Sequence, residues 1–291
     1  MRESKRFEGC LLWEGSPMLL QRCALSLVLV FGLAGPAASS PITLSGNFSG
    51  ADYGTADMSL VNGSGSGAFW VSDAGIGPPY GQNDRLRLTS TGGGQRGNAW
   101  YNPTTVFANH DWDLSFTMQV TYPQGGGADG MAFHMQEVGT AADTFIEGQG
   151  LGANYLSVVF DTWNNADHCS VDWGLAVYNN GSTVGSCIDL SSIGTPDPWA
   201  YDVEMTHDDV SNYLTVKVTQ TNSGAWTYET YAVDLSALDE ATFGWSGQTG
   251  GSGENHDVVS FNGTFVPEPG TALLLGLGLV GLGADRRRRR S

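Results

Sequence analysis

Short runs of alternating apolar and polar residues dominate the chain between residues 41 and 265. In 113–122, for example, Leu114, Phe116, Met118 and Val120 would share one face of a strand. Similar runs between Gly, Asn, Asp and Ser clusters predict strands at 85–89, 130–136, 173–178, 201–206, 213–219, 226–233, 242–246 and 258–265. Helical periodicity is scarce, and one helical turn is expected at 238–241. The pattern predicts an all-β sandwich or jelly roll of antiparallel sheets.

One predicted strand changes character abruptly at its end. The apolar run 156–160 is followed by the oxygen- and nitrogen-bearing side chains of Asp161, Asn164, Asn165, Asp167, His168 and Asp172. Carboxylate, amide and backbone oxygens at the rim of a sheet suit a calcium-type ion. An ordinary polar loop with Asx turns is the alternative, because Asn and Asp favour turns for backbone reasons.

Both ends of the chain have the pattern of targeting signals. Residues 1–40 combine basic residues, an apolar core at 23–31 and small residues at 34–40, which is typical of a secretory signal peptide. Met18 is an alternative start, because the segment before it is long for such a signal. The apolar core is too short for a membrane anchor across about 30 Å of hydrocarbon.

At the other end, Pro267-Glu268-Pro269 precedes an apolar stretch, 271–284, and then five arginines, 286–290. This tail, 266–291, resembles the PEP-CTERM sorting signal of Gram-negative bacteria that make extracellular polysaccharide. The resemblance implies export, transient membrane insertion of the short apolar helix, and removal of the tail by an exosortase. A permanent C-terminal anchor is the alternative. The expected location is the cell envelope, the cell surface or the extracellular matrix.

The remaining segment, 41–265, is long enough for one β-sandwich domain. It carries 25 acidic residues against four basic ones, a formal charge of −21. We do not expect nucleic acid as a partner, because phosphate binding needs a basic surface. The two cysteines of this segment, Cys169 and Cys187, predict a disulfide in an exported chain, with two free thiols as the alternative. They flank Asn179-Asn180-Gly181, which predicts a hairpin turn.

Three separated stretches resemble motifs of the legume-type (L-type) lectins. Residues 127–133 (GADGMAF) are similar to the ADGxAF motif, and 159–165 (VFDTWNN) to the metal-loop motif. Residues 243–250 (FGWSGQTG) with 258–261 are similar to the C-terminal pattern. The resemblance covers about 48–265 and implies a concanavalin A-like jelly-roll sandwich that binds carbohydrate.

The resemblance also implies roles for single residues. Asp129 and Asn165 would contact the sugar directly, and Gly150 and the backbone of Gly250 and Gly251 would belong to the same site. The peptide between Ala128 and Asp129 would be cis. The chemistry is suitable, because a carboxylate accepts hydrogen bonds from sugar hydroxyls while amides donate to them. The loop 250–256 would correspond to the variable loop that sets sugar preference in the family. Glu254, Asn255 and His256 are expected in a solvated loop, with tuning of sugar specificity as the alternative.

For the metal, the resemblance implies calcium held by Asp161, the backbone carbonyl of Trp163, and Asn165. The next ligand would be Asp167 or Asp172, and the sequence leaves that choice open. Plant members of the family bind a second, transition metal through a Glu and a His. Here Val159 stands at the Glu position and Asp172 at the His position, so calcium alone is expected.

An enzyme of the same architecture is not expected. Retaining glucanases need two carboxylates about 5–5.5 Å apart, and no predicted strand carries such a closely spaced pair. The sequence therefore predicts an exported, calcium-dependent binder of a glycan or exopolysaccharide. The alternative is a non-catalytic structural protein of the biofilm matrix, and a β-glucan hydrolase is the third hypothesis.

Overall fold

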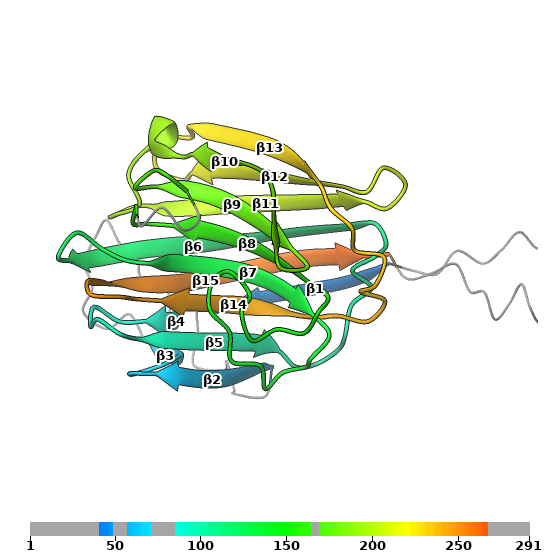
Figure 1. Ribbon diagram of the computed structural model, residues 1–291, viewed down its shortest axis with the longest axis horizontal. Coiled ribbons are helices and arrows are strands. Elements are labelled where there is room, and N and C mark those ends of the chain that lie inside the picture. Colours follow the sequence, from blue (N-terminus) through cyan, green and yellow to red (C-terminus); the bar gives the residue numbers. More distant parts are fainter. Residues whose placement is uncertain (1–40, 49–56, 72–84, 165–168, 267–291) are drawn as a thin grey trace, which may run out of the picture. The chain divides into compact units, whose positions relative to one another are not determined.

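A computed structural model describes residues 41–48, 57–71, 85–164 and 169–266 of the chain. The described residues belong to one compact unit, Ser40–Glu268. They form two antiparallel sheets and one short 3₁₀ helix, η1 (Ser191–Ile193) (Figure 1). The predicted signal peptide and the tail lie outside the described residues. Among the described residues, no helix is long and apolar enough to cross a membrane.

The first sheet has eight strands among the described residues, in the order β13-β12-β11-β6-β15-β4-β3, with β1 paired to β15. Their bounds are β1 (Ile42–Asn47), β3 (Phe69–Val71), β4 (Arg85–Thr89), β6 (Trp112–Gln124), β11 (Ala200–Asp208), β12 (Tyr213–Gln220), β13 (Trp226–Ala232) and β15 (Gly253–Phe265). We call it the eight-stranded sheet.

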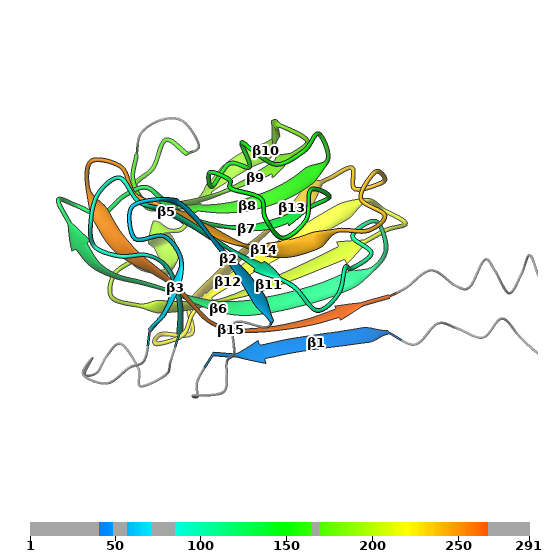
Figure 2. The same ribbon diagram turned by 90° about the horizontal axis from the view of Figure 1, so that it is seen from below.

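The second sheet has seven strands in the described part of the chain, in the order β10-β9-β8-β7-β14-β5-β2. Their bounds are β2 (Met58–Ser64), β5 (Arg96–Tyr101), β7 (Gly130–Gln136), β8 (Tyr155–Asp161), β9 (Gly174–Asn179), β10 (Ser182–Asp189) and β14 (Thr242–Gln248). Figure 2 shows this seven-stranded sheet and the eight-stranded sheet as two separate layers. The predicted all-β jelly-roll sandwich is therefore confirmed.

The core lies between the two sheets and is built by strand alternation. On β11, Tyr201, Val203 and Met205 are buried, while Asp202 and Glu204 point to the other face. Aromatic rings from both sheets meet in the centre of the core. The ring of Phe116 in the eight-stranded sheet packs on the rings of Phe133, Phe160 and Trp245 in the seven-stranded sheet. This packing fixes the relative position of the strand ends that carry the motifs.

Most strands predicted from alternation are present, and the differences are instructive. The helical turn expected at 238–241 is wrong, because residues 239 and 240 form a bend and Ala241 bridges to Val106. The last strand begins at Gly253, five residues before the predicted start at Val258. Five strands were not predicted: β1, β2, β3, β5 and β10. The hairpin at Asn180-Gly181 is confirmed, since both residues have positive φ between β9 and β10.

The predicted disulfide between Cys169 and Cys187 is present, with Cα atoms 5.5 Å apart. It joins the end of the 162–173 loop to β10, at the margin of the seven-stranded sheet. Cys169 is buried among Val159 and Ala176 of that sheet. The disulfide therefore anchors the far side of the loop that follows β8.

Candidate functional site

The three motif segments meet at one end of the central strands of the seven-stranded sheet. Strand β7 lies between β8 and β14, so the start of β7 faces the ends of both neighbours. Gly130 is paired with Asp161 on one side and with Gln248 on the other. Residues separated by more than 100 positions in the sequence therefore lie in one row of the sheet. The spatial convergence implied by the motif resemblance is present in the fold.

Asp129 immediately precedes this row and is held by both neighbouring strands. Its backbone N–H donates to the carbonyl of Gln248 at 2.8 Å, and its own carbonyl accepts from the N–H of Thr162 at 3.0 Å. The side-chain amide of Gln248 donates to Oδ2 of Asp129 at 3.0 Å. The peptide between Ala128 and Asp129 is cis, as the resemblance implied. The carboxylate is therefore fixed in position while remaining partly exposed.

Gly250 closes the site from the β14 side. A Cβ atom at Gly250 would lie 2.8 Å from Oδ1 of Asp129, whereas a Cβ at Gly251 would meet no atom within 4 Å. The carbonyl of Gly250 accepts a hydrogen bond of 2.8 Å from the N–H of Gly94. The close approach of backbone to carboxylate requires glycine at 250, and Gly251 faces open space.

Asp161, the last residue of β8 before the loop, is fully buried. Its Oδ1 accepts a hydrogen bond of 3.0 Å from the N–H of Trp163. This bond is an Asx-type turn, so the two interpretations of the loop share this geometry. The ring of Trp163 is 40% exposed and packs next to Gly126, in the loop before Asp129.

The described part of the loop fits a metal ion. A buried carboxylate is stable when it is hydrogen-bonded, paired or bound to a metal, and carboxylate and carbonyl oxygens suit calcium. Asp172 is exposed and lines an open hollow of about 530 Å³ together with Thr162 and Asn164. The other two predicted ligands, Asn165 and Asp167, lie outside the described residues.

The segment 254–256 differs from the expectation of a solvated loop. Glu254, Asn255 and His256 are all buried, because they belong to β15. The hydroxyl of Thr162 donates to Oε1 of Glu254. Nε2 of His256 lies 2.9 Å from the same oxygen, and its Nδ1 lies 2.7 Å from the hydroxyl of Thr89. This network ties the loop after β8 to the eight-stranded sheet.

Gly150 lies in the segment 137–154, which covers the outer face of the seven-stranded sheet. A Cβ at Gly150 would lie 2.4 Å from the carbonyl of Asp143. The carboxylate of Asp143 pairs with Arg96 at 2.6 Å. Arg96 is paired in register with Gln248, so this segment is coupled to the row that contains the Asp129 site. The sugar contact predicted for Gly150 stays a prediction.

His134 lies beneath the same segment, in the middle of β7. Its Nδ1 is 2.7 Å from the hydroxyl of Ser157 and its Nε2 is 2.7 Å from the hydroxyl of Ser246. The ring is fully buried and packs near Trp100. Burial deprives the charged imidazolium of hydration and lowers the pKa of His134 to about 3. The imidazole is therefore a neutral structural group behind the site.

A group of three carboxylates lies at the start of β6, at the other end of this strand from the Asp129 site. This group was not predicted from the sequence. The group consists of Asp111, Asp208 and Asp209, whose carboxylate oxygens lie within 4.8 Å of one another. Among the described residues, this is the group of acidic, His or Cys side chains close enough together to hold a metal ion. The N–H of Asp209 donates to Oδ1 of Asp111 at 2.9 Å. Asp111 precedes the start of β6, whereas the Asp129 site follows its end. The length of β6 therefore separates these carboxylates from the predicted metal loop.

Comparisons with known proteins agree with the fold and the motifs. The model of the legume-like lectin family matches residues 70–271. The chain belongs to this family, whose members are non-catalytic carbohydrate-binding proteins. This membership agrees with the expectation that the protein is not an enzyme. Residues 265–289 match the PEP-CTERM protein-sorting motif, which indicates export and sorting to the cell surface.

Curated relatives include the protein ERGIC-53 of Homo sapiens, 26% identical over 227 residues, and that of Rattus norvegicus, 26% identical over 223 residues. Each match covers 72% of this chain and 42% of the relative, so the chain spans less than half the length of these relatives. Peanut lectin with a 9mer peptide has a TM-score of 0.60 at 19% identity, covering 78% of this chain and 97% of that one. Lectin II from Ulex europaeus has a TM-score of 0.58 at 19% identity, covering 78% and 99%. These two structures share the fold.

Proposed function

We propose that this domain binds a glycan at the edge of the seven-stranded sheet, with Asp129 as the central acceptor. The observation that carries the proposal is the fixed carboxylate of Asp129, held by Gln248 and approached by the backbone of Gly250. A carboxylate accepts hydrogen bonds from two neighbouring sugar hydroxyls. Backbone groups of Gly250 and Gly251, together with the amide of Asn165, would supply the remaining contacts.

The binding is calcium-dependent in this proposal. Asp161, the carbonyl of Trp163 and Asn165 would hold the ion, with Asp167 or Asp172 as a further ligand. The ion, when bound, neutralises buried carboxylate charge and fixes the loop. Thr162 links this loop to both parts of the site, because its N–H donates to Asp129 and its hydroxyl to Glu254. Ordering the loop would therefore also order the sugar-binding carboxylate.

The tail supports a role outside the cell. An exported protein with a sorting motif at 265–289 meets glycans of the cell surface and the extracellular matrix. We propose that the ligand is the exopolysaccharide or surface glycan of the same cell. In this proposal the apolar stretch 271–284 inserts transiently into the membrane until an exosortase removes the tail.

A glycan array in calcium and in chelator tests the proposal. We expect calcium-dependent binding by the wild-type protein, and its loss in Asp129→Ala and Asn165→Ala. Asp208→Ala is the matched control, because it removes an exposed carboxylate of the group at the other end of β6. If both site variants retain glycan binding and cell-surface retention, the protein acts as a structural matrix module and the proposal fails.

A further inference from the structure

The outward face of the eight-stranded sheet carries mainly polar side chains across five strands. Side chains alternate along each strand, so every second residue points away from the core. One row of this face runs through paired residues of β13, β12, β11, β6 and β15, namely Tyr228, Lys217, Glu204, Ser115 and Asn262. The next row contains Trp226, Thr219, Asp202, Thr117 and Ser260. A third row contains Thr230, Thr215, Thr206, Asp113 and Thr264. We call these three rows the outer polar face.

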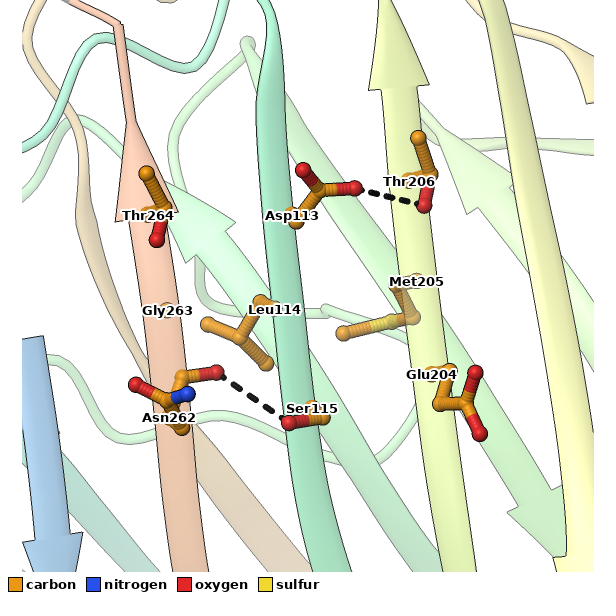
Figure 3. A pocket seen from close by; sticks show the side chains of 9 residues that line it. All are labelled: Asp113, Leu114, Ser115, Glu204, Met205, Thr206, Asn262, Gly263 and Thr264. Carbon is orange, nitrogen blue, oxygen red and sulfur yellow. Dashed lines mark hydrogen bonds between the residues drawn. The ribbon is translucent and has the colours of Figure 1, made fainter. Parts of the chain in front are cut away.

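Two adjoining open hollows of about 270 Å³ and 310 Å³ lie on this face, over β11, β6 and β15. They share Ser115, Glu204 and Asn262, so they form one continuous groove. Figure 3 shows the side chains of Asp113 and Thr206 at one end of this groove. Its lining combines hydroxyl, carboxylate and amide side chains with the apolar residues Leu114, Phe116, Met205 and Phe261.

Hydrogen bonds hold the carboxylates of the groove in fixed positions. Thr206 donates to Oδ1 of Asp113 at 2.8 Å, as drawn in Figure 3. Thr117 donates to Oδ1 of Asp202 at 2.6 Å. Lys217 donates to Oε1 of Glu204 at 2.9 Å. Each bond uses one carboxylate oxygen, and the second oxygen is left to accept from a ligand.

An exposed aromatic pair lies on the edge strand β13, which β12 separates from β11 and the groove. Trp226 is 56% exposed and Tyr228 is 58% exposed, although large apolar rings are normally buried. Their ring centroids are 6.0 Å apart and their planes are inclined by 31°. Both rings belong to the two rows that cross the groove. Exposed aromatic rings in the same rows as fixed acceptors match the two faces of a pyranose, one apolar and the other rich in hydroxyls.

We propose that the outer polar face is a second saccharide-binding surface, which takes a neutral polysaccharide chain lying across the strands. The bound polysaccharide would cross four strand spacings, about 19 Å, between Tyr228 on β13 and Asn262 on β15. This length suits several sugar units and not a single one. Trp226 and Tyr228 stack on sugar rings, and the groove accepts hydrogen bonds from hydroxyls.

The negative charge of the outer polar face favours a neutral polysaccharide over anionic ligands. The three rows of the outer polar face contain three acidic residues, Asp113, Asp202 and Glu204. They contain one basic residue, Lys217. Anionic polymers and a second copy of this acidic chain are repelled, whereas a neutral polysaccharide supplies many hydroxyl donors to a surface rich in acceptors. The surface is formed by the other sheet from the Asp129 site, so its binding does not require the metal loop and does not rest on the proposed function.

Affinity electrophoresis in native gels that contain hydroxyethyl cellulose, xylan, galactomannan or dextran tests this surface. We expect at least one of these neutral polysaccharides to retard the wild-type protein equally in calcium and in chelator. The double variant Trp226→Ala/Tyr228→Ala should lower the association constant about tenfold. Asn262→Arg should also weaken binding, because it fills the groove. Val210→Ala is the matched control, since Val210 is a 90% exposed apolar residue outside these rows.

The outcomes separate this surface from the Asp129 site. Asp129→Ala should retain the calcium-independent retardation. The inference is overturned if no polysaccharide retards the wild-type protein, or if the double variant and Asn262→Arg both bind as tightly as the wild type. It also fails if Asp129→Ala abolishes all retardation, in which case the proposed function stands alone. If sedimentation velocity shows that the double variant dissociates a dimer, the face is a self-association surface instead. Circular dichroism checks that each variant is folded. If the double variant is unfolded, the result with Asn262→Arg decides the test.

Discussion

The side-chain amide of Gln248 donates a hydrogen bond of 3.0 Å to Oδ2 of Asp129. The two residues are 119 positions apart in the sequence, and their backbones are also joined by the N–H of Asp129 and the carbonyl of Gln248. Gln248 therefore positions the carboxylate on which the proposed sugar site depends. It is the last residue of β14, so the core packing of that strand is transmitted directly to the site.

Replacing Gln248 should weaken glycan binding without unfolding the domain. Gln248→Ala releases the carboxylate of Asp129, and we expect about a tenfold loss of affinity, the effect of one hydrogen bond to a charged group of about 1.5 kcal/mol. Gln248→Glu should be worse, because it places a second negative charge beside Asp129. Calorimetry with an array-selected glycan measures both effects. Equal affinity in all three proteins would contradict the positioning role.

The neighbouring glycines provide a matched pair for the same carboxylate. Gly250→Ala places a methyl group 2.8 Å from Oδ1 of Asp129, which forces either the backbone or the carboxylate to move. Gly251→Ala points into open space and should leave Asp129 in place. We therefore expect a larger loss of glycan affinity for Gly250→Ala than for Gly251→Ala, with similar melting temperatures. An equal loss in both variants would show that the contact with Asp129 is not the cause.

Calcium should raise the melting temperature through the loop after β8. Binding to the folded state alone adds about 2.7 kcal/mol of stability at a free concentration of 100 times Kd. Asp161→Asn should abolish this increase, because it removes the buried carboxylate of the loop. Asp167→Asn and Asp172→Asn, compared side by side, identify the remaining ligand.

The exposed carboxylates at the other end of β6 supply the control for this titration. Asp208→Asn should leave the calcium-dependent increase in melting temperature unchanged, since Asp208 belongs to a separate acidic group. If Asp208→Asn removes the increase and Asp161→Asn does not, the ion binds at the acidic group and the assignment of the loop is wrong.

His134 predicts a stability loss in acid. Its pKa is lowered to about 3 in the folded protein, against about 6.5 in the unfolded chain. Between these values the unfolded chain binds the proton and the folded chain does not. The contribution is therefore complete above pH 6.5 and is lost as the pH falls toward 3, by at most about 4–5 kcal/mol. Its neighbours Ser157, Ser246 and Trp100 carry no charge that would offset this.

Denaturation at several pH values checks this linkage. His134→Gln removes the titrating group and keeps an amide that can bond to the two serines. Although the variant will be less stable at pH 7, its stability should fall less steeply than that of the wild type between pH 6.5 and 3. Carboxylates titrate equally in both proteins, so the difference in slope reports His134. Parallel curves would contradict the assigned cause.

The fold and part of the site could be predicted from sequence because both follow local patterns. Alternation gave most strands, and Asp129, Asp161 and Gly250 were placed by motifs that each stand at a strand end. Strand register, however, depends on long-range pairing that alternation does not specify. For that reason Gln248 was not singled out, and the bond between Glu254 and Thr162 was not foreseen: the partners lie 119 and 92 positions apart.

The segment 254–256 shows a second reason. Glu254, Asn255 and His256 are polar and follow a glycine-rich stretch, so they resembled a solvated loop. The bonds from Glu254 to Thr162 and His256 replace the water that these groups would otherwise bind. The outer polar face was also invisible in the sequence, because its rows are assembled from five separate strands.

The central claim is tested most directly by calorimetric titration of the best array glycan into calcium-loaded wild-type protein. Parallel titrations use the same protein in chelator and the calcium-loaded Asp129→Ala variant. The account predicts saturable binding by the calcium-loaded wild type and at least a tenfold weaker affinity in both other samples. Equal affinity in all three samples would contradict a calcium-dependent glycan site built on Asp129.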